Sequence, residues 1–442
     1  MSTPAMPALC SLVQQRGAFI SSKVAFEEDA SSAKRGVGVR AVEHIKEGTV
    51  VISIPFGLCI SVDSVTQLEP LKPLFDENPG LLDYPDEVLA VGLMFGRRAD
   101  RLSNDDVAAA AEALLNAHVR TMPKAFNTSL YWSDDEMTML RPSNAFHLTR
   151  LMKSQINNDW NSLHKPLALN YPEVLGHCTC ELYQWALSVV YSRAVGITRE
   201  GAYTRCIPPV LDMANHAPEA GSDAADTFRY DEPKDEVGLV CTSDRAIGDE
   251  CYAVYGAYPN AKLAFSYGFV VLNNPHRAVD LWARVTPTSY EAATKQALLQ
   301  ASLSTRNQFY DFTGTIRPGF VHPALLATIR VIQICDEKEM ASAANAFCGR
   351  MVSVRNELAT YGSLRDLIVA RMMVESAESD KLQLGQTLLS PDCDFSDRAL
   401  MALIVRVDER ELLHQALPLV DAWRARLGAE GEAFVCPDCH NL

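Results

Sequence analysis

The sequence predicts an α+β protein in which two β-rich segments are separated by a long helical segment and followed by a helical C-terminal region. In residues 24–60 apolar and polar side chains alternate, as they do in half-buried strands. Residues 84–195 carry apolar side chains at helical spacing instead. Short alternating segments with turns return between residues 206 and 271, and beyond residue 287 the helical spacing continues almost to the end.

In the first β-rich segment, alternate positions are apolar over residues 37–41 and again over residues 50–54. Lys46-Glu47-Gly48 predicts the turn between these two strands. The short segments of the second β-rich region are separated by three predicted turns, at residues 221–223, 231–235 and 247–249.

Helices are predicted from apolar stripes and from capping residues. An apolar stripe covers residues 88–95, and residues 103–106 form a capping signal for a helix over residues 107–119. Another helix is predicted to begin at residues 142–144. Two more amphipathic helices are predicted, over residues 182–190 and 400–417.

The chain has 442 residues, which is too long for one ordinary core, so several domains are expected. From the changes of pattern we predict four segments, with boundaries at 1–83, 84–195, 196–286 and 287–442. The net charge of −15 disfavours DNA or RNA as the main partner, because binding phosphates requires a positive field. The sequence has no membrane-spanning run and no signal-peptide pattern, so we expect a cytoplasmic, possibly nuclear, protein with no membrane partner.

The twelve cysteines are scattered, which is the pattern of small buried side chains in a reducing compartment. Two clusters contain possible metal ligands, at residues 177–180 and 436–440. A structural zinc site usually needs four ligands in two paired groups, and these clusters stand at distant places in the sequence. We therefore predict no metal site, with the C-terminal cluster left open.

The segment Gly36-Val37-Gly38 is compatible with two kinds of loop. A dinucleotide site needs its glycines between a strand and the start of a helix. Here the residues after Gly38 alternate as a strand, so the dinucleotide interpretation fails. The segment alone predicts a glycine-containing bend in a β-hairpin.

Three further motifs lie in the second β-rich region, the first of them about forty residues before the other two. Residues 211–218 read LDMANHAP, residues 254–256 read VYG, and residues 260–269 run from an asparagine to Tyr267-Gly268-Phe269. With the N-terminal Arg35-Gly36-Val37-Gly38, they resemble the active site of the SET-domain protein methyltransferases. The whole layout resembles the subgroup of the Rubisco large-subunit methyltransferase and the actin-histidine methyltransferase, over roughly residues 34–423.

The resemblance implies a split, β-rich SET domain with a helical insertion, followed by an all-α substrate-binding domain. It also implies S-adenosyl-L-methionine as the cofactor. The implied cofactor-binding residues are Arg35, Gly36, Val37, Gly38, Arg40, Arg193, Asn215 and His216. Among these, glycines would let the backbone approach the cofactor, and an arginine would reach its carboxylate.

By resemblance, Tyr255 is the catalytic residue. A tyrosine with an ordinary pKa of about 10 is a poor base at neutral pH, so we expect its hydroxyl to align the acceptor nitrogen instead. The implied substrate-binding residues are Ser192, Val195, Asp212, Tyr267 and Phe269. Main-chain carbonyls of Ser192 and Asp212 would line the acceptor channel, and the two rings would form its wall.

The acceptor is predicted to be a lysine of a non-histone protein. A histidine acceptor needs a polar partner for its second ring nitrogen, and Val195 offers none at a position near the substrate in the relatives. A protein-histidine methyltransferase is the alternative, and an inactive SET protein that only binds a partner is a third possibility. We expect the enzyme to act as a monomer.

Overall fold

The computed structural model describes residues 5–28, 36–97, 110–221, 224–302, 313–372, 380, 384 and 396–435. It contains two compact units. The first unit comprises residues 1–126 and 152–257, and the second comprises residues 127–151 and 258–442. The four segment boundaries predicted from the sequence stay a prediction. Among the helices of the described ranges, none combines the length and the apolar character needed to cross a membrane.

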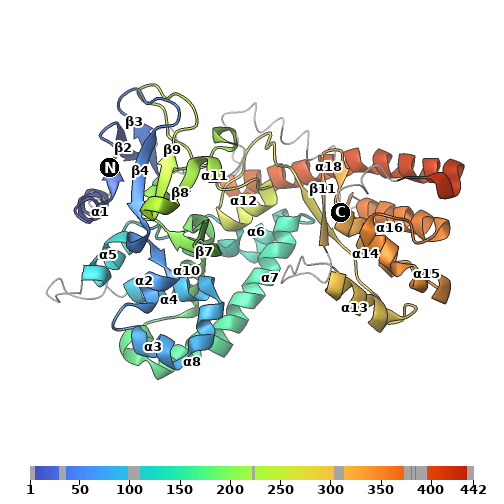
Figure 1. Cartoon of the computed structure of the whole chain (residues 1–442), viewed down its shortest axis with the longest axis horizontal. Helices are drawn as coiled ribbons and strands as arrows, with labels where there is room; N and C mark the ends of the chain where they lie inside the picture. Colours follow the sequence, from blue (N-terminus) through green and yellow to red (C-terminus); the bar gives the residue numbers. More distant parts are fainter. Residues whose placement is uncertain are drawn as a thin grey trace. The chain divides into compact units, whose positions relative to one another are not determined.

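The first unit is built on short antiparallel strands (Figure 1). The strands are β1 (Phe19–Ile20), β2 (Val24–Glu28), β3 (Val37–Ala41), β4 (Val50–Pro55), β5 (Ile60–Ser61), β6 (Val195–Arg199), β7 (Ala202–Ile207), β8 (Phe228–Asp231) and β9 (Glu236–Val240). They form a four-stranded sheet in the order β1-β4-β9-β8, a three-stranded sheet β5-β7-β6 and a pair β2-β3. Strands from both β-rich segments of the sequence therefore share one sheet, because β4 pairs with β9.

The alternation of apolar residues explains the two strands predicted near the N-terminus. In β4 the side chains of Ile52 and Ile54 are fully buried in the core, while Ser53 between them donates a hydrogen bond to Glu236 on β9. Gly48 forms the preceding turn with φ +78°, a backbone conformation that glycine adopts without strain. Both predicted strands and the turn between them are thus confirmed.

Helices cover the rest of the first unit: α1 (Ala5–Gln14), α2 (Val62–Thr66), α3 (Lys72–Glu77), α4 (Pro85–Arg97), α5 (Ala110–Val119), α8 (Lys165–Asn170), α9 (Pro172–Leu175), α10 (Cys180–Arg193) and α11 (Ala224–Thr227). The apolar stripe predicted over residues 88–95 is buried along its whole length in α4. The capping signal at residues 103–106 lies outside the described residues.

Helix α10 carries the chain from the helical segment to the candidate site. Its first turn is capped by the side chain of Thr179, which accepts a hydrogen bond from the backbone nitrogen of Leu182 at 3.2 Å. The phenol of Tyr183 donates to Glu87 on α4 at 3.0 Å, and the same carboxylate pairs with His164 at 2.7 Å. This buried polar network fixes α10 against α4, so that its last residue, Arg193, has a defined position.

The second unit is mostly helical, as predicted. Its helices are α6 (Asp134–Met139), α7 (Asn144–Asp159, through which the boundary between the units passes), α12 (Asn260–Ser266), α13 (Ala292–Ser302), α14 (Pro323–Ile332), α15 (Glu337–Ala341), α16 (Val354–Met372) and α18 (Asp397–Glu430). Helices α16 and α18 pack side by side over an apolar core (Figure 1). Arg330 on α14 and Glu357 on α16 form a bidentate ion pair, at 2.5 and 2.7 Å, with both side chains buried.

The all-α prediction for the region beyond residue 287 needs one correction. Strands β10 (Val279–Trp282), β11 (Thr313–Arg317) and β12 (Phe320–Val321) form an antiparallel sheet in the second unit. The turn between β11 and β12 contains Pro318-Gly319, with Gly319 at φ +69°. A Pro-Gly pair after β-branched residues is a hairpin signal, and the helical spacing around it obscured this signal in the sequence.

Asp408 on α18 gives the second unit a testable pH dependence. Burial raises the pKa of Asp408 to about 6, against the opposing effects of a hydrogen bond from Asn260 (2.5 Å) and of Arg277. In the folded state Asp408 therefore keeps a proton that it releases at about pH 4 in the unfolded chain. Protonated Asp408 therefore stabilises the folded state below about pH 4, and this stabilisation is lost as the pH rises toward 6.

We expect the free energy of unfolding to fall between these pH values, and Asp408→Asn to reduce that fall. Urea unfolding at a series of pH values measures it, and equal slopes for both proteins would contradict the assignment.

Candidate functional site

The Asn215-His216 motif follows β7 in a buried turn of the first unit. The apolar residues before it, Ile207 and Val210, are fully buried, and residues 211–213 form one 3-10 turn. Val210 has φ +71°, which is strained for a β-branched residue. Such strain persists only where the surrounding structure holds it, and it is common next to functional sites.

A short parallel pairing joins this motif to the one that contains Tyr255. The backbone nitrogen of Ala253 donates to the carbonyl oxygen of Asn215 at 2.8 Å, and that of Ala217 donates to the carbonyl oxygen of Ala253 at 3.0 Å. Two segments almost forty residues apart in the sequence therefore lie side by side. The pairing brings together two of the motifs that predict the site.

Next to this pairing, three contacts hold Tyr255. Its backbone nitrogen donates to Nδ1 of His216 at 3.1 Å, and the two rings stack with centroids 5.1 Å apart. Its hydroxyl donates to the carbonyl oxygen of Ala214 at 2.9 Å. Burial raises the pKa of Tyr255 to about 12, with Asp212 acting in the same direction and Arg193 opposing it. The phenol is therefore neutral at physiological pH.

His216 has a role that the sequence did not predict. Because its Nδ1 accepts from the backbone of Tyr255, the ring proton of the neutral form is on Nε2. The sequence assigns His216 to cofactor binding, and the geometry adds a positioning role toward the tyrosine. The assignment to the cofactor stays a prediction.

Arg193, at the end of α10, reaches the same buried turn. Its Nη1 donates both to the carboxylate and to the carbonyl oxygen of Asp212, each at 2.9 Å. Burial alone would raise the pKa of Asp212, but His118, 3.4 Å away, and Arg193 together lower it below its ordinary value. The predicted channel-lining carbonyl of Asp212 is thus already a hydrogen-bond acceptor. The side chain of Arg193 keeps 17% of its surface exposed.

The glycine segment forms the start of β3, and no helix follows it, as predicted. Gly36 has φ +70°, a conformation that favours glycine, whereas Gly38 is extended and pairs with Glu27 on β2. A Cβ atom on Gly38 would lie 2.3 Å from Oε1 of Glu250. Space for this carboxylate is therefore a reason for the glycine that the sequence did not reveal. Arg35 lies outside the described residues.

Residues 192–195 connect α10 to β6. The hydroxyl of Ser192 donates back to the carbonyl oxygen of Ser188 at 2.6 Å, inside the helix. Val195 is the first residue of β6, pairs with Cys206 and packs partly buried against the core of the first unit. The side chain at this position is an alkyl group with no hydrogen-bonding atom.

Tyr267 and Phe269 lie in the second unit, where their ring centroids are 6.1 Å apart. The rings of Tyr258 and Tyr267 also stack, with centroids 6.0 Å apart. A Cβ atom on Gly268 would lie 2.8 Å from the backbone of Asn127 and Thr128, so this position is confined to glycine. The predicted place of the two rings in the acceptor channel stays a prediction.

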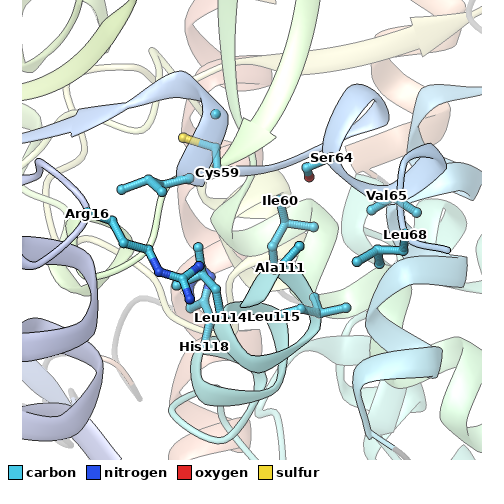
Figure 2. A pocket seen from close by; sticks show the side chains of 12 residues that line it. Arg16, Cys59, Ile60, Ser64, Val65, Leu68, Ala111, Leu114, Leu115 and His118 are labelled. Atoms are coloured by element: carbon cyan, nitrogen blue, oxygen red, sulfur yellow. The ribbon is translucent and has the colours of Figure 1, made fainter. Parts of the chain in front are cut away.

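A small cavity lies in the first unit, and the predicted cofactor-binding residues are not among those that line it. Figure 2 shows it between α5 and the segment of residues 57–68, with Arg16 and His118 on one side. Its volume is about 130 Å³. Sites for small organic ligands occupy roughly 300–1,000 Å³, so we do not assign the cofactor to it.

The cysteine-containing cluster at residues 177–180 makes ordinary protein contacts. His177 pairs with the carbonyl oxygen of Met94 at 2.9 Å, and Cys180 donates to Asn157. The C-terminal cluster at residues 436–440 lies outside the described residues.

Comparison with known proteins gives three findings. Residues 286–413 match the family model described as Rubisco LSMT substrate-binding. The chain is 25% identical over 438 residues to the actin-histidine N-methyltransferase of Mus musculus, covering 93% of this chain and 67% of that protein. The human enzyme of the same name (Homo sapiens) is 26% identical over 440 residues, with the same coverage.

Among solved structures, the SET domain of LSMT bound to lysine and AdoHcy matches with a TM-score of 0.75 and 19% identity. That match covers 97% of this chain and 92% of the other chain. Rubisco LSMT bound to AdoMet matches with a TM-score of 0.73 and 18% identity, covering 99% and 98%.

The class predicted from the sequence is confirmed by these findings and by the fold. The protein has the fold of the SET-domain protein methyltransferases of the Rubisco large-subunit and actin-histidine class. Its C-terminal helical region carries the substrate-binding domain of that class.

The first prediction for the site concerns Asn215. Asn215→Ala should weaken the binding of S-adenosylmethionine by at least about tenfold, or about 1.4 kcal/mol, because the amide would no longer contact the cofactor. The backbone of residue 215 keeps its pairing with Ala253, so the fold should survive. Calorimetry on the folded variant measures the affinity. An affinity equal to that of the wild type would remove Asn215 from the cofactor site.

The second prediction concerns the hydroxyl of Tyr255. Tyr255→Phe keeps the ring and its stacking on His216 but removes the hydroxyl, so kcat should fall by about a hundredfold or more while cofactor affinity changes little. Tyr267→Phe is the control, since that ring is assigned to a channel wall and its hydroxyl is not expected to act in the transfer. Steady-state kinetics separates the two. A large loss in Tyr267→Phe with little loss in Tyr255→Phe would reverse the assignment of the tyrosines.

Proposed function

We propose that this protein is an S-adenosylmethionine-dependent protein methyltransferase that modifies a side-chain nitrogen of another protein. The observation that carries the proposal is the network around the pairing of residues 215–217 with Ala253. It holds the neutral hydroxyl of Tyr255 on the carbonyl oxygen of Ala214, the residue next to Asn215, while Arg193 binds Asp212 in the same turn. Asn215 and Arg193 carry polar groups that suit the amino-acid end of the cofactor.

The residues of the first unit fit that cofactor by their chemistry. The α-carboxylate of S-adenosylmethionine is an anion that suits the guanidinium of Arg193, whose side chain is partly exposed. The α-ammonium is a donor that needs an oxygen, and the amide of Asn215 has one. When bound, S-adenosylmethionine supplies a methyl group on a positively charged sulfur.

Tyr255 contributes alignment, with its proton retained throughout. Because its hydroxyl proton points to Ala214, the lone pairs of the oxygen face away from that carbonyl. They can accept a weak C–H hydrogen bond from a polarised methyl group or a hydrogen bond from the acceptor nitrogen. With a pKa raised to about 12, the phenol cannot serve as the base near neutral pH, so the acceptor must arrive neutral.

We infer that the acceptor is a histidine. The relatives that match over 93% of the chain carry the name actin-histidine N-methyltransferase, and they support this choice. A neutral imidazole also has a lone pair at physiological pH, which suits a site with a neutral tyrosine in place of a base.

Lysine is the second candidate, and one residue favours it. Val195 presents only an alkyl surface at a position predicted to lie near the substrate, which suits the stem of a lysine. The LSMT structures that match the fold were solved with lysine or methyllysine. The match of residues 286–413 to a substrate-binding domain supports a protein substrate, and we propose that this protein is not a histone.

The test is methyl transfer to proteins of a cell lysate, with S-adenosylmethionine labelled in its methyl group. Hydrolysis of the labelled protein and chromatography of the amino acids separate methylhistidine from methyllysine. We expect labelled methylhistidine with the wild type and about a hundredfold less label with Tyr255→Phe. Labelled methyllysine alone would establish the second candidate, and equal labelling by both proteins would contradict the proposed mechanism.

A third prediction uses the position of Val195. Val195→Asn adds an amide that can hydrogen-bond the second nitrogen of an imidazole, so the ratio of histidine to lysine methylation should rise at least about fivefold, roughly 1 kcal/mol. Competing peptides that differ only in a central histidine or lysine measure the ratio. Val195→Leu, which adds bulk without polarity, is the control. A ratio unchanged by the asparagine would show that residue 195 does not contact the acceptor.

A further inference from the structure

Glu250 is a buried acid beside the predicted cofactor-binding residues, and none of the motifs includes it. Its side chain is 3% exposed. It faces Gly38, Arg40 and Asn215, which the sequence assigns to the cofactor.

The backbone fixes Glu250 firmly against β3. Before Glu250, the nitrogen of Ala41 donates to the carbonyl oxygen of Asp249 at 2.8 Å. After it, the nitrogen of Cys251 donates to the carbonyl oxygen of Val39 at 2.7 Å. Glu250 itself forms a bridge with Arg40 between these two bonds. Its side chain therefore starts from a rigid position next to the glycine segment.

The carboxylate determines which way the amide of Asn215 points. Nδ2 of Asn215 donates to Oε1 of Glu250 at 2.7 Å. A carboxylate only accepts hydrogen bonds, so it binds the NH2 side of the amide and excludes its oxygen. The amide oxygen is then the atom that Asn215 presents to a ligand. If the amide could turn freely, it would often present its NH2 group instead. An ammonium group is itself a donor and cannot form a hydrogen bond with that NH2 group.

Among the described residues, the ion pair that Glu250 forms with Arg40 is a long one. Nη2 of Arg40 stands 4.0 Å from Oε2, while Nη1 of the same guanidinium donates to the carbonyl oxygen of Gly248 at 3.1 Å. Gly38 leaves the carboxylate the space it needs, since a Cβ there would collide with it. A buried carboxylate at the limit of ion-pair distance favours a further cation nearby.

We propose that Glu250 is a positioning residue for the α-ammonium group of the cofactor. It holds Asn215 with its oxygen toward that ammonium and adds negative charge behind the amide. This inference rests on the proposed function and deepens it, because it assigns the selectivity for the amino group to one residue.

The experiment compares two ligands, S-adenosylhomocysteine and its desamino analogue, in which hydrogen replaces the α-ammonium group. Glu250→Ala should lower the affinity for S-adenosylhomocysteine at least about tenfold and that for the desamino analogue less than about threefold, as calorimetry measures them. Glu250→Gln keeps an acceptor oxygen for Asn215 but removes the charge, so its loss for S-adenosylhomocysteine should be smaller, yet still confined to the ligand with the amine.

Glu236→Gln is the matched control. Glu236 also accepts a hydrogen bond from a neutral side chain, Ser53 at 2.6 Å, and it lies on β9 outside the site. This variant should bind both ligands as the wild type does. If Glu250→Ala does not fold, Glu250→Gln carries the comparison.

Equal weakening of both ligands in the Glu250 variants would mean a general structural role and would overturn the inference. Unchanged affinities would overturn it as well, while leaving the proposed function intact. A wild-type protein that binds neither ligand would contradict the proposed function itself.

Discussion

The candidate site depends on the parallel pairing of residues 215–217 with Ala253. Its two backbone hydrogen bonds hold together segments that the sequence separates by almost forty residues. Once they are paired, His216 meets the backbone and ring of Tyr255, and the hydroxyl of Tyr255 reaches Ala214. Because these contacts all start from backbone positions fixed by the pairing, none of the side chains needs to find its place independently. Such preorganisation is what in-line methyl transfer requires, since the reacting atoms must stay aligned.

Two buried carboxylates, those of Asp212 and Glu250, support this arrangement. Asp212 fixes Arg193 and contacts His118, while Glu250 fixes Asn215. Each carboxylate is buried with a donor that is itself a predicted cofactor-binding residue. An unpaired charge at either place would be costly in the interior, so each pair constrains both of its members. Asp212 and Glu250 thus orient Arg193 and Asn215, the side chains that would bind the carboxylate and the ammonium group of the cofactor.

The sequence predicted the fold class, the strands on both sides of Gly48, and the helices α4, α10 and α18, because apolar periodicity reports directly on burial. It predicted α7 from the start signal at residues 142–144. It missed β11 and β12, since a short hairpin inside a helical region has too few residues to show its own period. It also missed Glu250 and His118. A glutamate after an aspartate near a turn is typical of a solvated loop, and only the pairing of distant segments buries it. Val195 and the acceptor illustrate a different difficulty: one side chain favours lysine, while relatives that align over 93% of the chain carry the name actin-histidine N-methyltransferase.

The most direct measurement of the central claim is a crystal structure of the protein with S-adenosylhomocysteine. The account predicts that the amino-acid end of the ligand lies between Arg193 and Asn215, with its sulfur facing the hydroxyl of Tyr255. It also predicts that the pairing of residues 215–217 with Ala253 is unchanged by the ligand. A ligand bound elsewhere in the protein, or a sulfur turned away from Tyr255, would contradict the assignment of this site to methyl transfer.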